Sequence, residues 1–211
     1  MGSLGINGKL NADIKFPDNY KDDDNILHGA SLLNSKLDGN NHTISNVNIE
    51  GIPCRLYDSI GNSTLKNLKI EVQGECKQSI YYLTEYAYYS TIENCTFVSM
   101  APAAMTFFDL NPKNTSSFHL VVRNNLFSGV CEAGQGTWFT TRNVTSKTFE
   151  NNYRTNGFVV ANWGVDAAEM PVETTLPMET LFKDVAGRDF TITDKNSEVY
   201  TNGIGDPHWI K

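Results

Sequence analysis

The chain has 211 residues and a formal net charge of −7, and apolar residues make up 40% of it. This length suits one all-β domain, and the apolar fraction lies below the usual range of about 45–50%, so polar side chains must build part of any core. The acidic balance argues against a nucleic-acid-binding protein, and no apolar run approaches the roughly 18 residues of a membrane span.

Residues 1–36 precede the first clear repeat, and we expect them to form a strand that leads into the repeats and a cap over their first end. The opening residues, MGSLGING, lack the charged and apolar segments of a signal peptide, so we expect a mature or truncated chain whose export signal lies elsewhere. The acidic stretch PDNYKDDDN lacks the glycine and the final glutamate of an EF-hand loop. This difference favours a solvated charged loop over a metal site.

A short motif begins at residue 43 as TISNVNI and returns as TLKNLKI, TIENCTF, VVRNNLF and TFENNYR. In each copy the alternation of apolar residues slips by one position at an asparagine. Such a slip predicts two short strands that meet at a sharp bend, and asparagine tolerates the left-handed conformation that the bend needs. The motif asparagines are Asn46, Asn67, Asn94, Asn124 and Asn151.

These asparagines are 21, 27, 30 and 27 residues apart, a period that predicts an all-β fold of stacked coils, a right-handed parallel β-helix with capped ends. Stacking at about 4.8 Å would turn the asparagines into a ladder in which each amide bonds to the next coil. Two apolar columns would accompany it, the first being Ile44, Leu65, Ile92, Val122 and Phe149, and the second Ile49, Ile70, Phe97 and Phe127. Arg154 replaces the last apolar residue, so we expect the ladder to end there.

The ends of a stack need covers, because open coils expose backbone and core. We place the coils in residues 37–165, and the final coil with a C-terminal cap carried by Trp209 in residues 166–211, all within one continuous domain. None of the four cysteines forms a CxxC pair, which argues against zinc bound by thiolates. Stacking would make Cys54 and Cys76 neighbours, so a disulfide between them and free buried thiols stay open as alternatives.

Two groups of residues resemble known β-helix families. KLNADIKF, LDGNNHTISNVNI and LYDSIGNSTLKNLKI are similar to the GLUG-type repeats of bacterial surface proteins. STIENCTF, the RNNLF and ENNY copies, LFKDVAGRDFTI and GDPHW resemble C-terminal β-helix domains of exported Bacteroidota-type proteins, which often end in a GDPrW-like tail. The resemblance covers most of the chain and implies a glycan-associated protein, extracellular or on the outer cell surface. The fold alone does not fix the function, because β-helices serve lyases, hydrolases, adhesins and scaffolds.

Among enzymes, a polysaccharide lyase is the sharpest hypothesis, with Arg123 or Lys66 as its base. β-helix lyases usually also hold calcium through carboxylates on neighbouring coils, and the motif strands carry no stacked aspartates for it. A glycosidase would need two carboxylates about 5–10 Å apart, for which Asp109, Glu132 and Glu150 are unspecific candidates. We therefore expect no catalytic residue, metal or cofactor, with calcium possible only if the chain is a lyase.

The candidates for ligand contact are aromatic residues outside the shared positions. YYLTEYAYYS, residues 81–90, holds five tyrosines, and Trp138 follows the loop EAGQG. Such rings offer a flat apolar face with a polar tip, which suits stacking against sugars. We expect Tyr81, Tyr86, Tyr89 and Trp138 to contact a glycan, unless these rings instead cover the seams and ends of the coils.

The repeated features are structural, so the function must lie in what the repeats do not share. The sequence predicts a non-catalytic extracellular module, glycan-binding or adhesin-like, within a bacterial surface protein whose partner is a carbohydrate. A polysaccharide lyase or glycoside hydrolase is the first alternative. A structural spacer with protein partners is the second.

Overall fold

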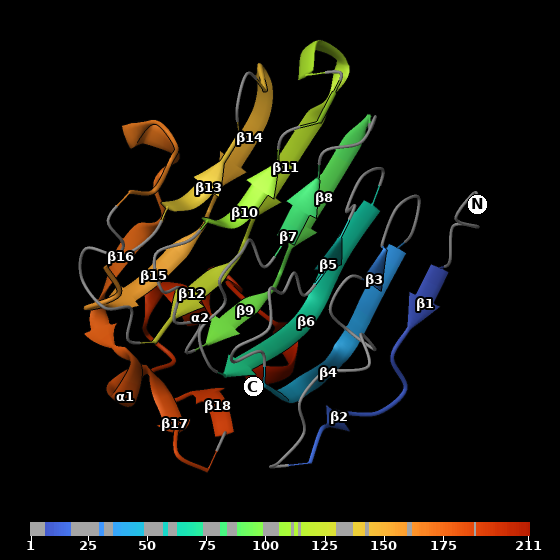
Figure 1. The fold of residues 1–211 in the computed structure, drawn as a ribbon. Coiled ribbons are helices and arrows are strands. Elements are labelled where there is room, and N and C mark those ends of the chain that lie inside the picture. Colours follow the sequence, from blue (N-terminus) through green and yellow to red (C-terminus); the bar gives the residue numbers. More distant parts are fainter. Residues whose placement is uncertain are drawn as a thin grey trace.

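The computed structural model describes residues 7–17, 30–31, 36–48, 57–58, 63–73, 81–83, 88–98, 106–110, 112–113, 115–129, 137–141, 144–159, 162–187 and 189–211. This part of the chain is mostly β with few helices, and two of its three sheets pair in parallel wherever a register is defined (Figure 1). The predicted all-β class is confirmed at that level. Cys54, Cys76 and Cys131 lie outside the described residues, and Cys95 is buried, with its Sγ donating to the Glu93 carbonyl at 3.2 Å.

The largest sheet has eleven strands, which form two rows on either side of the bends. The row before the bends contains β1 (Asn7–Lys9), the first halves of β4 (Lys36–Asn48) and β6 (Ser63–Gln73), β8 (Tyr89–Glu93), β11 (His119–Arg123) and β14 (Ser146–Glu150). The row after the bends contains β2 (Ile14–Lys15), the second halves of β4 and β6, β9 (Thr96–Val98), β12 (Leu126–Ser128), β15 (Tyr153–Asn156) and β16 (Val172–Pro177).

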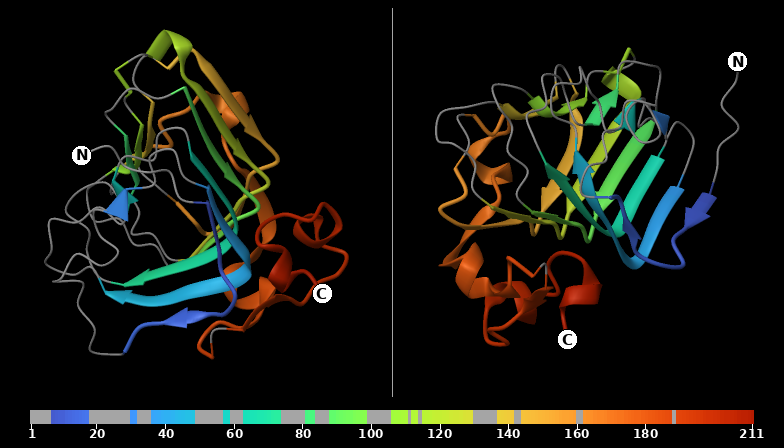
Figure 2. Two further views of the ribbon diagram at one scale, coloured as in Figure 1. Left: turned by 90° about the vertical axis from the view of Figure 1, so that its right-hand side faces the viewer. Right: turned by 60° about the horizontal axis from the view of Figure 1, so that its bottom comes forward.

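A five-stranded parallel sheet faces these two rows across the interior (Figure 2). Its strands are β3 (Ala30–Ser31), β5 (Tyr57–Asp58), β7 (Tyr81–Leu83), β10 (Thr106–Leu110) and β13 (Thr137–Thr140). A 3-10 turn, η1 (Thr115–Ser117), lies between β10 and β11. Each motif from β4 onward therefore supplies a strand before the bend and a strand after it, and in most motifs a strand of the facing sheet follows.

The core consists of aromatic rings that repeat at matched positions. Phe97 and Phe127 stack with centroids 5.4 Å apart, and Phe108 and Phe139 of the facing sheet stack at 4.7 Å. Phe97 meets Phe108 edge to face at 5.8 Å, which closes the interior between the sheets. All four rings are at most 1% exposed. In-register pairing places identical side chains about 4.8 Å apart, so rings at one motif position stack directly.

The register between the first two motifs differs from the predicted alignment. Leu37 pairs with Leu65 and Ile44 pairs with Ile70, so TISNVNI follows the bend instead of containing it. The bend lies in the preceding DGNN, where Asn40 and Asn41 have φ of 50° and 65°. Leu37 therefore begins the first apolar column, and Ile44 belongs to the second, where it pairs with Ile14 of β2. Asn46 is a residue of β4 beyond the bend, and Ile49 lies outside the described residues.

The predicted left-handed bend is confirmed at four of the five motif asparagines. Their φ angles lie between 50° and 54°, at Asn67, Asn94, Asn124 and Asn151. In the early motifs the bend side chain also reaches back to the previous repeat. The Asn40 amide donates to the Leu10 carbonyl at 3.0 Å, and the Asn67 amide donates to the Asp38 carboxylate at 3.1 Å.

In the later motifs the buried amides belong to the residue after the bend, which corrects the predicted ladder by one position. Asn125 Nδ2 donates to Asn152 Oδ1 and to the Ile92 carbonyl, both at 3.0 Å, and Asn125 Oδ1 accepts from the Cys95 N–H at 3.0 Å. Asn152 Nδ2 donates to the carbonyl of Val122 at 2.8 Å. Asn125 and Asn152 are buried, whereas the bend residues beside them are more exposed. The left-handed residue reverses the alternation, so its successor faces inward.

The C-terminal segment covers the side of the stack, whereas the sequence predicted a cap over its end (Figure 2). It contains α1 (Met178–Leu181), the antiparallel pair β17 (Phe182–Asp184) and β18 (Asp189–Ile192), α2 (Glu198–Thr201) and the 3-10 turn η3 (Pro207–Trp209). One apolar cluster joins this segment to the outer face of β9, β12 and β15: Val98, Leu126, Tyr153, Met178, Leu181, Phe182, Phe190, Ile192, Val199 and Ile204. The three strands after the bend are thus buried on both faces.

The segment after β15 packs beside the last strands of the stack. Trp138 lies edge to face with Phe158 at 5.0 Å and with Trp163 at 5.9 Å, and all three rings are buried. The next turn, η2 (Ala167–Glu169), is held against β14 by Lys147, whose ammonium lies 2.9 Å from the Glu169 carboxylate.

The GDPHW tail is tied to the bends. The Gly205 N–H donates to the Asn124 carbonyl at 2.8 Å, and the Asp206 N–H donates to Thr96 Oγ1 at 2.9 Å. The buried Asp206 carboxylate then accepts from the His208 N–H at 3.0 Å, and Pro207 begins η3. Gly205 has φ of 93°, and a Cβ there would lie 2.5 Å from Thr96 Oγ1. Only glycine allows this close approach.

Gly205→Ala should destabilise the protein more than Gly203→Ala does. Both glycines have positive φ, so both changes incur the left-handed penalty of about 1–2 kcal/mol. A Cβ at Gly203 meets nothing within 4 Å, whereas one at Gly205 meets Thr96 and Leu126. Urea unfolding of the two variants separates the contact from the strain, and equal losses would contradict the tight docking of the tail.

Candidate functional site

The two alternative bases predicted from the sequence, Lys66 and Arg123, lie in a row of alternating charges. Parallel pairing aligns six outward positions of the strands before the bends: Lys9, Asp38, Lys66, Glu93, Arg123 and Glu150. Opposite charges on neighbouring strands attract, so this row stabilises the register. The sequence motif already places Lys66, Glu93, Arg123 and Glu150 at one position, but it puts Ser45 where the structure has Asp38.

Both candidate bases take part in ion pairs. Lys66 Nζ lies 3.4 Å from Asp38 Oδ2, and Arg123 donates to Glu93 Oε2 from Nε at 2.9 Å and from Nη2 at 2.7 Å. Burial works against the Asp38 charge, but hydrogen bonds from the Asn40 N–H and the Asn67 amide, with the Lys66 ammonium, hold the pKa of Asp38 below its usual value. Each cation is thus held against a carboxylate of the preceding strand.

Of the predicted aromatic contacts, Trp138 is a core residue. Its ring is fully buried and packs edge to face on Phe127 at 5.4 Å, so it cannot stack on a glycan. Tyr89 is 37% exposed on β8, and the adjacent Tyr88 is 67% exposed. Tyr81 belongs to β7, but its side chain lies outside the described part, as does all of Tyr86.

The predicted carboxylate candidates occupy separate places. Asp109 belongs to β10 in the five-stranded sheet, Glu150 ends β14 in the other sheet, and Glu132 lies outside the described residues. The acidic stretch PDNYKDDDN also lies outside the described residues, except for its first residue, Pro17. Within the described ranges, no three His, Cys, Asp or Glu side chains are grouped to hold a metal ion. None of the helices in those ranges has the length and apolar character needed to cross a bilayer.

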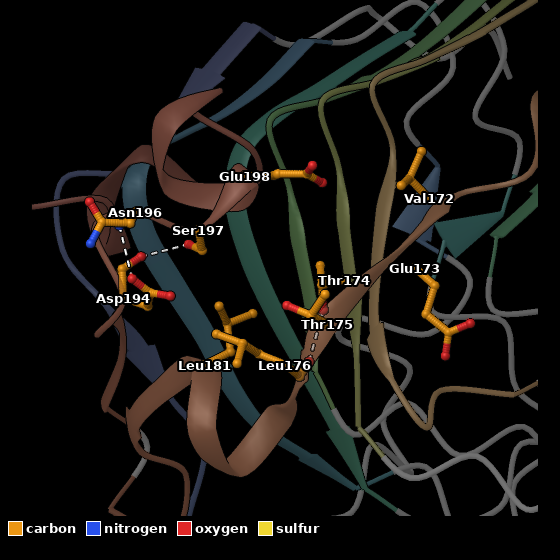
Figure 3. Close-up of a pocket in the computed structure, with 10 residues that line it drawn as sticks. All are labelled: Val172, Glu173, Thr174, Thr175, Leu176, Leu181, Asp194, Asn196, Ser197 and Glu198. Atoms are coloured by element: carbon orange, nitrogen blue, oxygen red, sulfur yellow. Dashed lines mark hydrogen bonds between the residues drawn. The ribbon is translucent and has the colours of Figure 1, made fainter.

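A pocket of about 390 Å³ lies between β16 and the turn that leads into α2 (Figure 3). Its lining consists of Val172, Glu173, Thr174, Thr175, Leu176, Leu181, Asp194, Asn196, Ser197 and Glu198. The two leucines provide an apolar surface, and polar groups from two separate segments surround it. Sequence reasoning missed this site, since no motif marks it and only the folding of the C-terminal segment onto the stack brings the two segments together.

Internal hydrogen bonds fix the polar walls of this pocket. Thr174 Oγ1 donates to the Leu176 carbonyl at 2.8 Å. On the opposite wall, Ser197 Oγ donates to the Asp194 carbonyl at 2.6 Å and accepts from the Tyr200 N–H at 3.3 Å. The Asp194 carboxylate accepts from the Asn196 N–H at 2.9 Å through Oδ1. The site is therefore pre-formed, and it offers hydroxyl, amide and carboxylate groups above leucine side chains.

The pocket lining is acidic. Glu173 is neutralised by Arg154, whose Nη2 lies 2.6 Å from Glu173 Oε2, and whose guanidinium also donates to the Phe158 carbonyl and lies over the Trp163 ring. Among the described residues, neither Asp194 nor Glu198 forms an ion pair with a lysine or arginine. Arg154 replaces the apolar residue expected in the second column. Its guanidinium instead pairs with Glu173, which lines the pocket.

A second cluster of titratable groups lies where the tail meets β4. His42 Nδ1 lies 3.2 Å from Asp13 Oδ1, which also accepts from the Thr43 N–H at 2.9 Å. Burial opposes the Asp13 charge, but these two bonds hold the pKa of Asp13 below its usual value. His208 lies close enough to Asp13 and His42 for both side chains to affect its pKa. Burial, with the positive charges of Lys211 and His42, lowers the pKa of His208, although Asp13 and Asp189 oppose the shift.

One family model matches the chain over residues 90–209, and its description is a domain of unknown function (DUF5123). The match covers more than half of the chain, from β8 to η3, and includes the pocket and the GDPHW tail. No curated protein and no solved structure matches the chain.

The stability of the protein should fall as the pH drops below about 6.5, the ordinary pKa of histidine. Folding lowers the pKa of His208, so the unfolded chain binds this proton first. The contribution of His208 is complete above the unfolded pKa and is lost as the pH falls from it towards the folded pKa. His208→Gln should flatten this slope between pH 7 and pH 5 in urea unfolding, and His119→Gln on β11 is the control. Parallel curves for wild type and His208→Gln would contradict the assignment.

Proposed function

We propose that the chain, which belongs to the DUF5123 family, is a non-catalytic carbohydrate-binding module built on a right-handed parallel β-helix. The order of the strands supports the helix. From β8 the chain visits the row before the bend, the row after it and the facing sheet, then repeats that order through β11, β12 and β13 (Figure 1). Parallel pairing at every step is what a β-helix requires.

The non-catalytic part of the proposal is supported by the charge row. Lys66 and Arg123 are each paired with a carboxylate of the preceding strand, and a lyase base has to be free to accept a proton. Their alternation with Asp38 and Glu93 serves the register of the sheet. The two residues that the sequence offers for catalysis thus have a structural explanation.

The single observation that carries the carbohydrate proposal is the pocket beside β16. A sugar ring presents hydroxyls at its edge and C–H groups on its face, and binding sites for small molecules combine an apolar surface with a few fixed polar groups. Leu176 and Leu181 supply the apolar surface, and Thr175, Asn196 and Glu198 surround it. The exposed rings of Tyr88 and Tyr89 offer a second surface for stacking.

The location is part of the same proposal. The resemblance of the sequence to bacterial surface proteins favours an extracellular module at the outer cell surface. There the stack would serve as a rigid scaffold that presents the pocket to a glycan.

Retention of glycans on a panel of bacterial and plant polysaccharides tests the function. The wild type should retain at least one of them without releasing unsaturated or reducing products. Thr175→Tyr fills the pocket from an exposed position and should weaken retention about tenfold or more, equivalent to roughly 1.4 kcal/mol. Thr145→Tyr, at an exposed position outside the pocket, is the matched control.

Two results would overturn this proposal. Product release that disappears in Arg123→Ala or Lys66→Ala would make the protein an enzyme. Failure of the wild type to retain any glycan would favour a structural spacer with protein partners.

A further inference from the structure

We propose that the pocket beside β16 selects its sugar by charge, binding an amino sugar through its ammonium group and rejecting an acidic sugar. This inference rests on the proposed function and names the ligand class of the same site. Its basis is the combination of a pre-formed cavity, an apolar surface and two carboxylates that no lysine or arginine pairs with in the part of the chain that the structure describes.

The charge balance of the lining is the first step. Three carboxylates line the pocket, and among the described residues only Glu173 has an arginine partner. The nearby Lys195 lies over the ring of Tyr200, with its ammonium 5.6 Å from the ring centroid. Asp194 and Glu198 are therefore two negative charges that line one cavity, and a bound cation would be attracted to both.

The geometry of the two carboxylates is the second step. The Asn196 N–H fixes Asp194 through Oδ1, and this bond leaves Oδ2 for a ligand. Glu198 extends from α2 towards the side of the pocket that β16 forms (Figure 3). Asp194 and Glu198 therefore lie at the two ends of the turn that forms one wall of the cavity. A carboxylate binds an ammonium group through charge-assisted hydrogen bonds, which are stronger than neutral ones.

The remaining lining suits the rest of a sugar ring. The hydroxyl of Ser197 is occupied by Asp194 and Tyr200, so it holds the wall and does not serve the ligand. Thr175 and Asn196 are exposed and can bond to ring hydroxyls, above the surface of Leu176 and Leu181. A volume of about 390 Å³ is near the lower end of small-molecule sites, about 300–1,000 Å³, so the site suits a short sugar unit.

The same charges exclude acidic sugars. The carboxylate of a uronic acid would face Asp194 and Glu198 in a partly enclosed site, where like charges repel more strongly than in water. The neutral N-acetyl form keeps the hydroxyls of an amino sugar but lacks its charge. The order of affinity should therefore be amino sugar, then N-acetyl sugar, then uronic acid.

An NMR titration with three methyl glycosides, of glucosamine, N-acetylglucosamine and glucuronic acid, tests this order at neutral pH. The glucosaminide should bind at least about tenfold more tightly than the glucuronide, and added salt should reduce the difference by screening. Its shift changes should lie in residues 172–176 and 194–198. Glu198→Gln should remove most of the preference and keep the binding of the N-acetyl sugar. Glu179→Gln, at an exposed carboxylate of α1 outside the lining, should change neither.

Equal affinity for the three glycosides would overturn the inference, as would a preference that persists in Glu198→Gln combined with Asp194→Asn. Asn at 194 keeps the acceptor for the Asn196 N–H, so that variant should keep the wall intact, which its melting temperature checks. If glycans are still retained and Thr175→Tyr abolishes retention, but charge has no effect, the proposed function holds and only the amino-sugar assignment fails.

Discussion

The whole architecture depends on the contact that each repeat makes at its bend. An asparagine with φ near +50° turns the chain, and in the later repeats the asparagine after it, Asn125 or Asn152, faces inward and bonds to the neighbouring repeat. A buried amide would be costly without these partners, so the bond fixes one register out of many. With that register fixed, Phe97 lies over Phe127 and Phe108 over Phe139, and opposite charges alternate on the outer face. Packing and electrostatics are thus both consequences of the bend.

The candidate site arises where the repeat pattern stops. Arg154 occupies the place of a core side chain, and its guanidinium pairs with Glu173 on the last strand. The chain then folds back over the outer face of the sheet, and Gly205 ties its end to the bend at Asn124. This return brings the turn at residues 194–198 beside β16 and encloses the pocket. The repeats provide a rigid support, and the segment that does not repeat provides the chemistry.

The features of the fold that the sequence could predict are those governed by local backbone rules. The slip in alternation at Asn94 indicated a left-handed bend, and backbone geometry alone decides that feature. The motif TISNVNI predicts a bend at Asn46, but the bend lies in the preceding DGNN, where Asn40 and Asn41 have positive φ. Trp138 was a candidate for ligand contact because its ring lies outside the repeated positions, but Phe158 and Trp163, which come later in the chain, pack against it. The pocket forms only where residues 172–176 meet residues 194–198, and no local sequence pattern encodes that contact.

The free energy of unfolding of Asn125→Leu tests the central role of the buried amides most directly. Leucine would leave the Cys95 N–H without its acceptor and would remove the side-chain donor from Asn152 Oδ1, which keeps the backbone N–H of residue 125, so we predict a loss of about 1–3 kcal/mol. Asn151→Gly is the comparison: it changes an exposed bend residue, glycine accepts φ of 50°, and we predict a loss below about 1 kcal/mol. Asn125→Leu that unfolds at the same urea concentration as the wild type would contradict the account.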